Sequence, residues 1–302
     1  MIRILMLDLG DTLVRGDVVL PNVPEALETL REFKTADGSA LEVALVSDYY
    51  MPDPPATPAK IEKLFKEYTK LLDHWGLSKF FKPFKRHVTL STNAGVQKPD
   101  RRVFELAVTR LGLNAKLNEC LFITEKPEHI SACRELEMAT LWFAPEAVGG
   151  DFDDWSEAPL LVNQLIGAES HNLELGLKLQ LASKYGMELT SMTKKPAGNK
   201  IQARAQKWHP VPNPKGAGKE KVHVPITVDV EIELGKKGRI RSVKGDQPDS
   251  ETVADAAGFV ESLAANEQIS DESGPLAPGT THQIETDKKG QKRLVRKRFS
   301  AI

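Results

Sequence analysis

The chain has 302 residues, of which 40% are hydrophobic and 27% are charged, a composition typical of a folded globular protein. Its net charge of -1 excludes a polyelectrolyte-binding protein that relies on overall charge, and no segment approaches the roughly 18 apolar residues of a membrane span. At about 100–200 residues per domain we expect two domains, and the short apolar run after Met1 predicts a buried strand of a cytoplasmic protein, not a signal peptide.

The first half of the sequence alternates between two kinds of pattern. Near-continuous apolar runs predict strands at 2–9, 41–48, 87–91, 119–124 and 139–144. Apolar residues at helical spacing predict helices at 21–34, 58–76, 99–112 and 127–137. This alternation predicts an α/β fold with a doubly wound parallel sheet, whose ligands bind beyond the carboxyl ends of the strands.

The pattern changes after about residue 150. A helix is expected at 161–186 and another at 249–266, where Asp249 or Ser250 is placed to cap it. Strands are expected at 199–208, 222–234 and 239–243, and a closing hairpin at 282–299 turns at 287–290. We therefore predict a second, α+β domain over 151–302, after a first domain over 1–150. Its role, as a lid or a partner-binding module, stays open.

The two cysteines, Cys120 and Cys133, have no metal-type pairing and lie in apolar or helical surroundings. We expect them to be buried structural thiols, which fits a reducing compartment.

Four polar residues lie at the ends of predicted strands of the first domain or in the loops just after them. Asp8 ends the first strand, with Gly10 and Thr12 close behind it, and Ser47 ends the second. Lys98 precedes a helix, and Glu125 ends the fourth strand. Because the carboxyl ends of parallel strands meet at one edge, we expect these groups to face a single crevice.

The order and the residues of these motifs resemble those of the haloacid dehalogenase (HAD) superfamily over about residues 1–145. The segments "DLGDTL" and "GVQKPDRRVFELAVTRLG" carry most of the resemblance. It implies a Rossmann-like hydrolase domain that removes phosphate from a phosphomonoester through an aspartyl-phosphate on Asp8, with Mg²⁺ as cofactor. By the same resemblance, Thr12, Ser47 and Lys98 would bind the phosphate. Asp8, the Gly10 carbonyl and Glu125 would hold the metal.

Two positions depart from the family pattern. Gly10 stands where the family has a second Asp, the acid/base that protonates the leaving group, and losing such a group typically costs about 10²–10⁴-fold in rate. A substrate with a good leaving group would suffer least. The fourth motif reads Thr124-Glu125, and the positions of its later acid hold His129 and Ile130, so we expect weakened binding of Mg²⁺.

The segments between the motifs are too short for a large cap, and family members without a cap often act on macromolecules. Two hypotheses remain: a phosphomonoester hydrolase, and a catalytically impaired binding module for a protein or nucleic-acid partner. The second relies on the basic C-terminal hairpin, which has Lys292, Leu294, Arg296 and Arg298 on one strand face and Arg293, Val295, Lys297 and Phe299 on the other. The same charges also suit an edge strand kept soluble, and Trp208 and His209 are interpreted as packing residues.

Overall fold

The computed structural model describes residues 1–167, 169–192, 198–216, 220–235, 237–270, 276 and 278–297. The chain forms two compact units, one of Met1–Gln180 with Lys237–Arg239 and one of Leu181–Lys236 with Ile240–Ile302. The sequence placed the boundary at residue 150. In the structure, α8 (Ala158–Ile166) and α9 (Ser170–Gln180) group with the first unit, because most of the residues of α8 are buried in its core.

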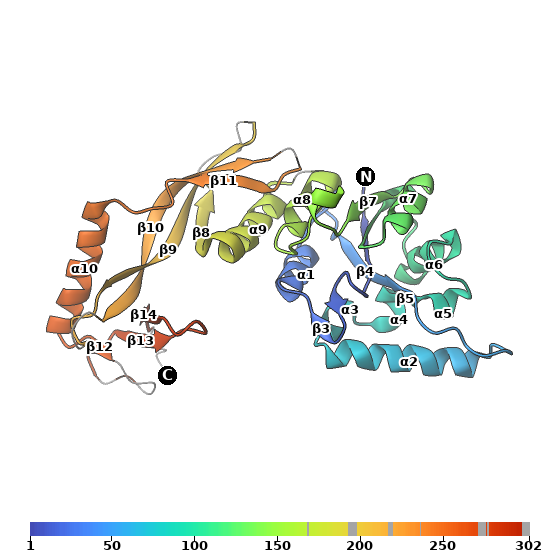
Figure 1. Cartoon of the computed structure of the whole chain (residues 1–302), viewed down its shortest axis with the longest axis horizontal. Coiled ribbons are helices and arrows are strands. Elements are labelled where there is room, and N and C mark those ends of the chain that lie inside the picture. Colours follow the sequence, from blue (N-terminus) through green and yellow to red (C-terminus); the bar gives the residue numbers. More distant parts are fainter. Residues whose placement is uncertain are drawn as a thin grey trace. The chain divides into compact units, whose positions relative to one another are not determined.

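The first unit is built on a five-stranded sheet in the order β5-β4-β1-β6-β7, in which every neighbouring pair is parallel. Its strands are β1 (Ile4–Leu7), β4 (Glu42–Ser47), β5 (Val88–Leu90), β6 (Cys120–Thr124) and β7 (Ala139–Trp142) (Figure 1). All five match expected strands, and the predicted doubly wound α/β fold is confirmed.

Helices cover both faces of this sheet, which is why its strands are apolar on both sides. Leu5 and Leu7 of β1 pack in a cluster with α1 (Val23–Arg31), α2 (Pro58–His74) and α8. Ile4 and Met6 face the opposite way, into a cluster with α6 (Arg101–Leu111) and α7 (Pro127–Glu135). Each such side chain, fully buried, contributes about 1.5–3 kcal/mol.

Only short elements occupy the other connections of the first unit. They are the hairpin β2 (Val14–Arg15) and β3 (Val18–Val19), α3 (Ser78–Phe81), α4 (Phe84–His87), α5 (Ser91–Ala94), η1 (Leu117–Glu119) and η2 (Glu146–Val148). As expected, no large cap interrupts the described part of this unit. Within the same unit, Lys237 and Arg239 form ion pairs with Asp151 and Glu157, at 2.9 and 3.1 Å.

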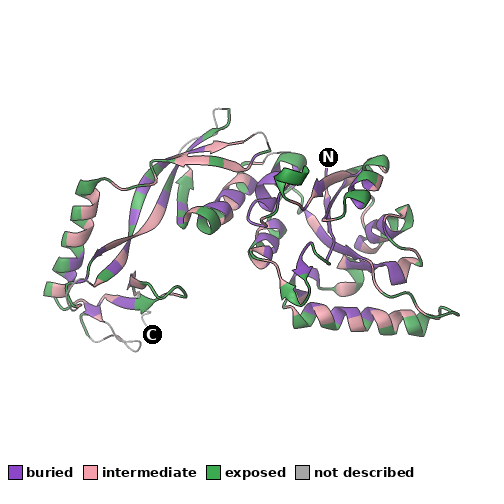
Figure 2. Ribbon diagram, viewed as in Figure 1, coloured by how far each residue is buried: buried purple, intermediate pink, exposed green. Residues whose placement is uncertain are grey.

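In its described residues, the second unit consists of a mixed sheet, the helix α10 (Ser250–Ala265) and a π-helical turn. Its path is β12-β13-β14-β10-β9-β8, and β11 pairs with β10. The bounds are β8 (Met187–Met192), β9 (Lys200–Pro212), β10 (Lys221–Leu234), β11 (Ile240–Lys244), α10 (Ser250–Ala265), β12 (Ile269–Ser270), β13 (His282–Thr286) and β14 (Lys292–Arg296). A π-helical turn, Leu181–Tyr185, precedes β8. Burial alternates along β10 (Figure 2), as expected for a strand with one buried face. The α+β prediction is therefore confirmed for this sheet-rich region.

The closing hairpin forms at the expected turn, but its second strand is not at an edge. β14 lies between β13 and β10, which it meets in parallel at His223 and Arg293. Ion pairs join Lys292 to Glu220, Arg293 to Asp287 and Lys297 to Glu285. The interpretation as an edge strand was thus wrong, because local charge pattern does not reveal a non-local neighbour. Arg298 and Phe299 lie outside the described residues.

Three further expectations can be compared with the structure. The helix expected at 161–186 is broken near Gly167, whose φ of 127° lies where only glycine is unstrained. Asp249 caps α10 by accepting a hydrogen bond from the Thr252 amide at 2.7 Å. Cys120 and Cys133 are free and buried as predicted, and burial raises the pKa of each thiol to about 12.

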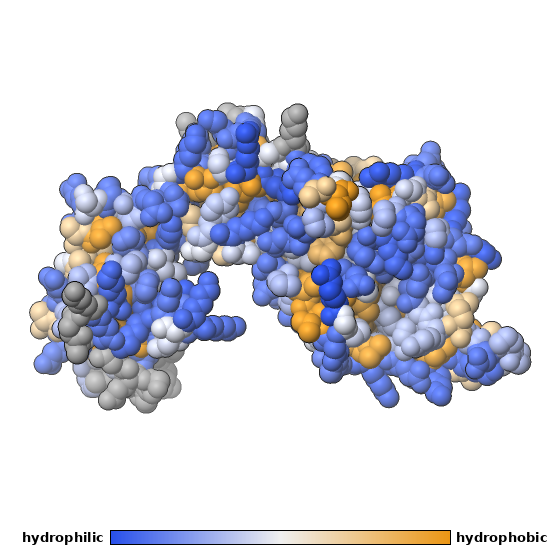
Figure 3. Space-filling model, in the orientation of Figure 1, coloured by the Kyte–Doolittle hydropathy of each residue, from blue (hydrophilic) through white to orange (hydrophobic). Residues whose placement is uncertain are grey.

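The surface agrees with the composition. The face visible in Figure 3 is mostly hydrophilic, with small hydrophobic patches. In the described part of the chain, no helix combines the length and the apolar character needed to cross a membrane.

Candidate active site

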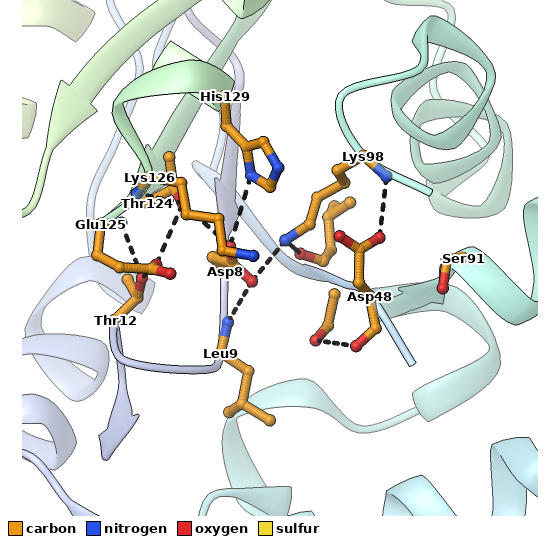
Figure 4. A network of polar contacts seen from close by, with 12 residues as sticks. Asp8, Leu9, Thr12, Asp48, Ser91, Lys98, Thr124, Glu125, Lys126 and His129 are labelled. Carbon is orange, nitrogen blue, oxygen red and sulfur yellow. Dashed lines mark hydrogen bonds and ion pairs between the residues drawn. The ribbon is translucent and has the colours of Figure 1, made fainter. Parts of the chain in front are cut away.

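Three adjacent strands bring the predicted site residues to one edge of the sheet. Asp8 follows β1, Ser47 ends β4, and Glu125 follows β6, with β1 in the middle. Lys98 reaches the same edge from the loop between α5 and α6 (Figure 4). The strand-end expectation therefore holds for the positions of these four residues.

A buried ion pair lies at the centre of this edge. Lys98 Nζ is 2.5 Å from Asp8 Oδ1, and the two side chains are 1% and 7% exposed. The ammonium also donates to the Val46 carbonyl at 3.0 Å, while the Lys98 amide donates to Asp48 Oδ1 at 2.9 Å. A buried charge needs such partners. Lys98 is therefore held in place at its side-chain ammonium and at its backbone amide.

The Asp8 carboxylate is held by donors on both oxygens. The Leu9 amide donates to Oδ1 at 2.8 Å, and the Thr124 hydroxyl donates to Oδ2 at 3.0 Å. With Lys98 added, three groups from separate parts of the chain fix its orientation. A carboxylate fixed and paired in this way is pre-positioned to attack an electrophile.

Glu125 is linked to Thr12 by reciprocal hydrogen bonds. The Thr12 hydroxyl donates to Glu125 Oε2 at 2.5 Å, and the Glu125 amide donates to the Thr12 hydroxyl at 3.1 Å. Burial, and then the charge of Asp8, raises the pKa of Glu125. The Thr12 hydroxyl, expected to bind phosphate, is here a partner of Glu125.

Two tryptophans fix the backbone of this pair. Trp155 Nε1 donates to the Thr12 carbonyl at 2.7 Å, and Trp142 Nε1 donates to the Glu125 carbonyl at 2.8 Å. Both loops of the site are therefore anchored by indole groups that the sequence gave no reason to connect with it.

His129 is a member of the site that the sequence did not identify as one. Its side chain is 5% exposed, and its Nδ1 lies 4.0 Å from Asp8 Oδ2. This buried Nδ1 has no hydrogen-bond partner among the described residues. Burial, and then the charge of Lys98, lowers the pKa of His129, which favours the neutral form of the ring. Its place in the first turn of the helix after β6 is the signal that marks it.

Ser47 lies at the end of β4, next in the chain to Val46, which accepts from Lys98. Its hydroxyl donates to the Asp48 carbonyl at 3.3 Å. Burial raises the pKa of Tyr68, and the neighbouring Ser47 hydroxyl acts in the opposite direction. Ser47 thus borders the crevice without a hydrogen bond to Asp8 among those that the structure describes.

The loop after Asp8 has an unusual order of residues. Asp11 has a φ of 52°, in the left-handed region, whereas Gly10 does not lie in that region. A Cβ added at Gly10 would meet no atom within 4 Å. Asp11 is exposed and pairs with Arg15 at 3.4 Å. The loop therefore has room for a side chain at residue 10, and it places a non-glycine residue where glycine is favoured.

The donors at this edge suit a hard cation in part. Asp8 and Glu125 offer carboxylate oxygens, and the Gly10 carbonyl accepts no hydrogen bond from the described residues. In the described part of the chain, no three His, Cys, Asp or Glu side chains are grouped to hold a metal ion. Mg²⁺ is usually bound by one or two carboxylates together with water and substrate phosphate, so these donors fit Mg²⁺ that arrives with a phosphate.

Comparison with known proteins gave structural similarities only. No protein-family model matches the sequence, and no similar curated protein was found. The HAD phosphatase from Thermococcus onnurineus is 18% identical with a TM-score of 0.35, covering 50% of this chain and 59% of its own. The putative HAD-hydrolase YfnB from Bacillus subtilis, bound to magnesium, is 18% identical with a TM-score of 0.30, and the match covers 42% of this chain and 45% of that protein. A Had-superfamily hydrolase from Ehrlichia chaffeensis is 13% identical with a TM-score of 0.33, and the match covers 47% of this chain and 87% of that protein.

Proposed function

We propose that this protein is a HAD-like hydrolase that removes the phosphoryl group from a phosphomonoester. The observation that carries the proposal is the buried pair of Asp8 and Lys98 at the carboxyl end of the central strand. A carboxylate that attacks phosphate must overcome repulsion between like charges, and a fixed ammonium lowers that repulsion. Phosphoryl transfer needs mainly such positioning and charge stabilisation.

Each residue then has a stated role. One Asp8 oxygen attacks phosphorus, the bond to the leaving oxygen breaks, and an aspartyl-phosphate forms. Lys98, placed 2.5 Å from Asp8, stabilises the charge on the phosphoryl oxygens, and Ser47 donates to one of them. Water then attacks the phosphorus and releases phosphate and the Asp8 carboxylate. Asp8, Glu125 and the Gly10 carbonyl would hold Mg²⁺, which supplies further charge screening when bound.

The test is hydrolysis of a panel of phosphomonoesters with and without Mg²⁺, comparing the wild type with Asp8→Asn. We expect Mg²⁺-dependent turnover in the wild type and its loss in Asp8→Asn. Asp73→Asn is the matched control, because Asp73 is an exposed carboxylate that pairs with Lys82 at 3.9 Å on the protein surface. Turnover that survives in Asp8→Asn would contradict the mechanism.

A second function, a binding module without turnover, is favoured by one observation. Thr12 and Glu125 hydrogen bond to each other, so neither is free for phosphate or metal without breaking that contact. A ligand of the native state raises its melting temperature. A protein with no turnover and no melting shift on addition of Mg²⁺ and inorganic phosphate would support this second function over the first.

A further inference from the structure

Two exposed side chains follow β4, in the segment that begins at Ser47 of the proposed site. Tyr50 is 72% exposed and Met51 is 43% exposed, and they follow Ser47 by three and four positions. The backbone beneath them is well anchored. Thr92 Oγ1 donates to the Tyr50 carbonyl at 2.7 Å, and the Tyr49 amide and carbonyl both bond the Ser91 hydroxyl, at 2.9 and 3.0 Å. The backbone that carries the Tyr50 ring is therefore held in place.

A tyrosine ladder (Tyr68, Tyr49 and Tyr50) connects this segment to the site. Tyr68 is buried beside Ser47, and its ring centroid is 5.1 Å from that of Tyr49, at 76°. Tyr49 in turn lies 4.9 Å from Tyr50, at 61°. These are edge-to-face contacts, the arrangement that aromatic rings prefer. The ladder therefore runs from Ser47, at the end of β4, to the exposed ring of Tyr50.

The chemistry of residue 10 limits which leaving groups can depart at the proposed site. Gly10 has no side chain to protonate the leaving oxygen. A phenol, with a pKa of about 10, departs as its anion far more readily than an alcohol, whose pKa is near the roughly 16 of water. The missing acid thus favours an aryl over an alkyl phosphate, and an exposed aromatic ring is a suitable surface for an aryl group.

We propose that the substrates are aryl phosphates whose ring packs on Tyr50 and Met51 while the phosphate meets Asp8, Ser47 and Lys98. This rests on the proposed function of the same site. Asp8 forms its bond to phosphorus as the bond to the phenolic oxygen breaks, and the phenolate leaves with the electron pair and takes a proton from solvent. Water then forms the new bond to phosphorus, the bond to Asp8 breaks, and the water proton passes to solvent.

The first test compares substrates in the full-length protein with Mg²⁺. The panel is 4-nitrophenyl phosphate, phenyl phosphate, phosphotyrosine, a phosphotyrosyl peptide, adenosine 5'-monophosphate and glycerol phosphate. We expect kcat/KM for phenyl phosphate to exceed that for the two alkyl phosphates by about 10²–10⁴-fold. Turnover of either phosphotyrosine form supports the proposal, and their ratio separates a small from a peptide-borne substrate. Equal kcat/KM for aryl and alkyl phosphates would overturn it.

The second test isolates the ring surface from leaving-group chemistry. Acetyl phosphate has a good leaving group but no ring, so the ratio of kcat/KM for phenyl phosphate to that for acetyl phosphate reports the ring contact. We expect Tyr50→Ala to lower this ratio about three- to tenfold and Tyr50→Phe to preserve it. An unchanged ratio in Tyr50→Ala would refute the ring contact. Absence of turnover on every substrate would instead refute the proposed hydrolase.

Discussion

Exchanging the residues at positions 10 and 11 tests whether this site lacks only a proton donor. In Gly10→Asp/Asp11→Gly, a carboxyl is placed two residues after Asp8, and glycine takes the position with a φ of 52°. The added Cβ at residue 10 meets no atom within 4 Å, and the backbone there is not left-handed. We therefore expect the folded state to accept both changes, with a net effect on stability within about 1 kcal/mol.

The expected gain follows from the chemistry of the leaving group. A positioned general acid contributes typically 10²–10⁴-fold to the rate. We expect kcat/KM for an alkyl phosphate to rise by about that factor at neutral pH. For 4-nitrophenyl phosphate the gain should be small, because its leaving group needs no proton. The measurement is steady-state hydrolysis of both substrates by the wild type and the double variant.

The matched control is Gly10→Asn/Asp11→Gly, which has the same shape without the acid. If the Asn variant gains as much as the Asp variant, the effect is conformational and the acid plays no part. If neither variant gains on alkyl phosphates while both keep wild-type melting temperatures and turnover of 4-nitrophenyl phosphate, residue 10 does not face the leaving group. Either result would refute the reasoning from Gly10.

Two further predictions concern charge. Lys98→Met leaves the buried Asp8 carboxylate without its cation, so we expect the free energy of unfolding to fall by about 3–5 kcal/mol. Urea denaturation measures this loss, and the double variant Asp8→Asn/Lys98→Met should recover part of it. Burial, and then the charge of Arg296, lowers the pKa of His282 below its ordinary 6.5. The free energy of unfolding should therefore fall as the pH drops below 6.5, and it should fall less in His282→Gln. The midpoints of urea denaturation at pH 5 and pH 7.5 measure both changes.

Most elements of the first unit follow from local patterns in the sequence. Its parallel strands are buried on both faces, so their apolar runs are continuous and easily identified. The β8 strand, which alternates buried and exposed residues over part of its length, begins just after the helix expected at 161–186 and was not predicted. The strand β9 continues through His209 and Pro210 to Pro212, because pairing with β10 overrides the turn preference of proline.

The sequence predicted mainly those site residues that lie at the carboxyl ends of parallel strands, where such strands place their ligand-binding groups. That rule found Asp8, Ser47 and Glu125, because each follows a strand whose carboxyl end is at the same edge. It did not find the tryptophan anchors, since those contacts join residues far apart in the sequence, and it passed over His129, whose place in the first turn of α7 was a local signal. Tertiary contacts of this kind have no periodicity that a sequence can display.

The hydrogen bonds of Asp8 indicate which of its oxygens attacks. Oδ1 is bound to both Lys98 and the Leu9 amide, and neither donor has another carboxylate acceptor at this edge in the described structure. Among the described residues, Oδ2 accepts a hydrogen bond from Thr124 alone, whose hydroxyl also lies 3.3 Å from Glu125 Oε2. Thr124 can thus turn to Glu125 and keep a hydrogen bond, whereas an unpaired Lys98 would be a costly buried charge. We therefore expect Oδ2 to be the nucleophile, with Lys98 holding Oδ1 as the phosphoryl group arrives.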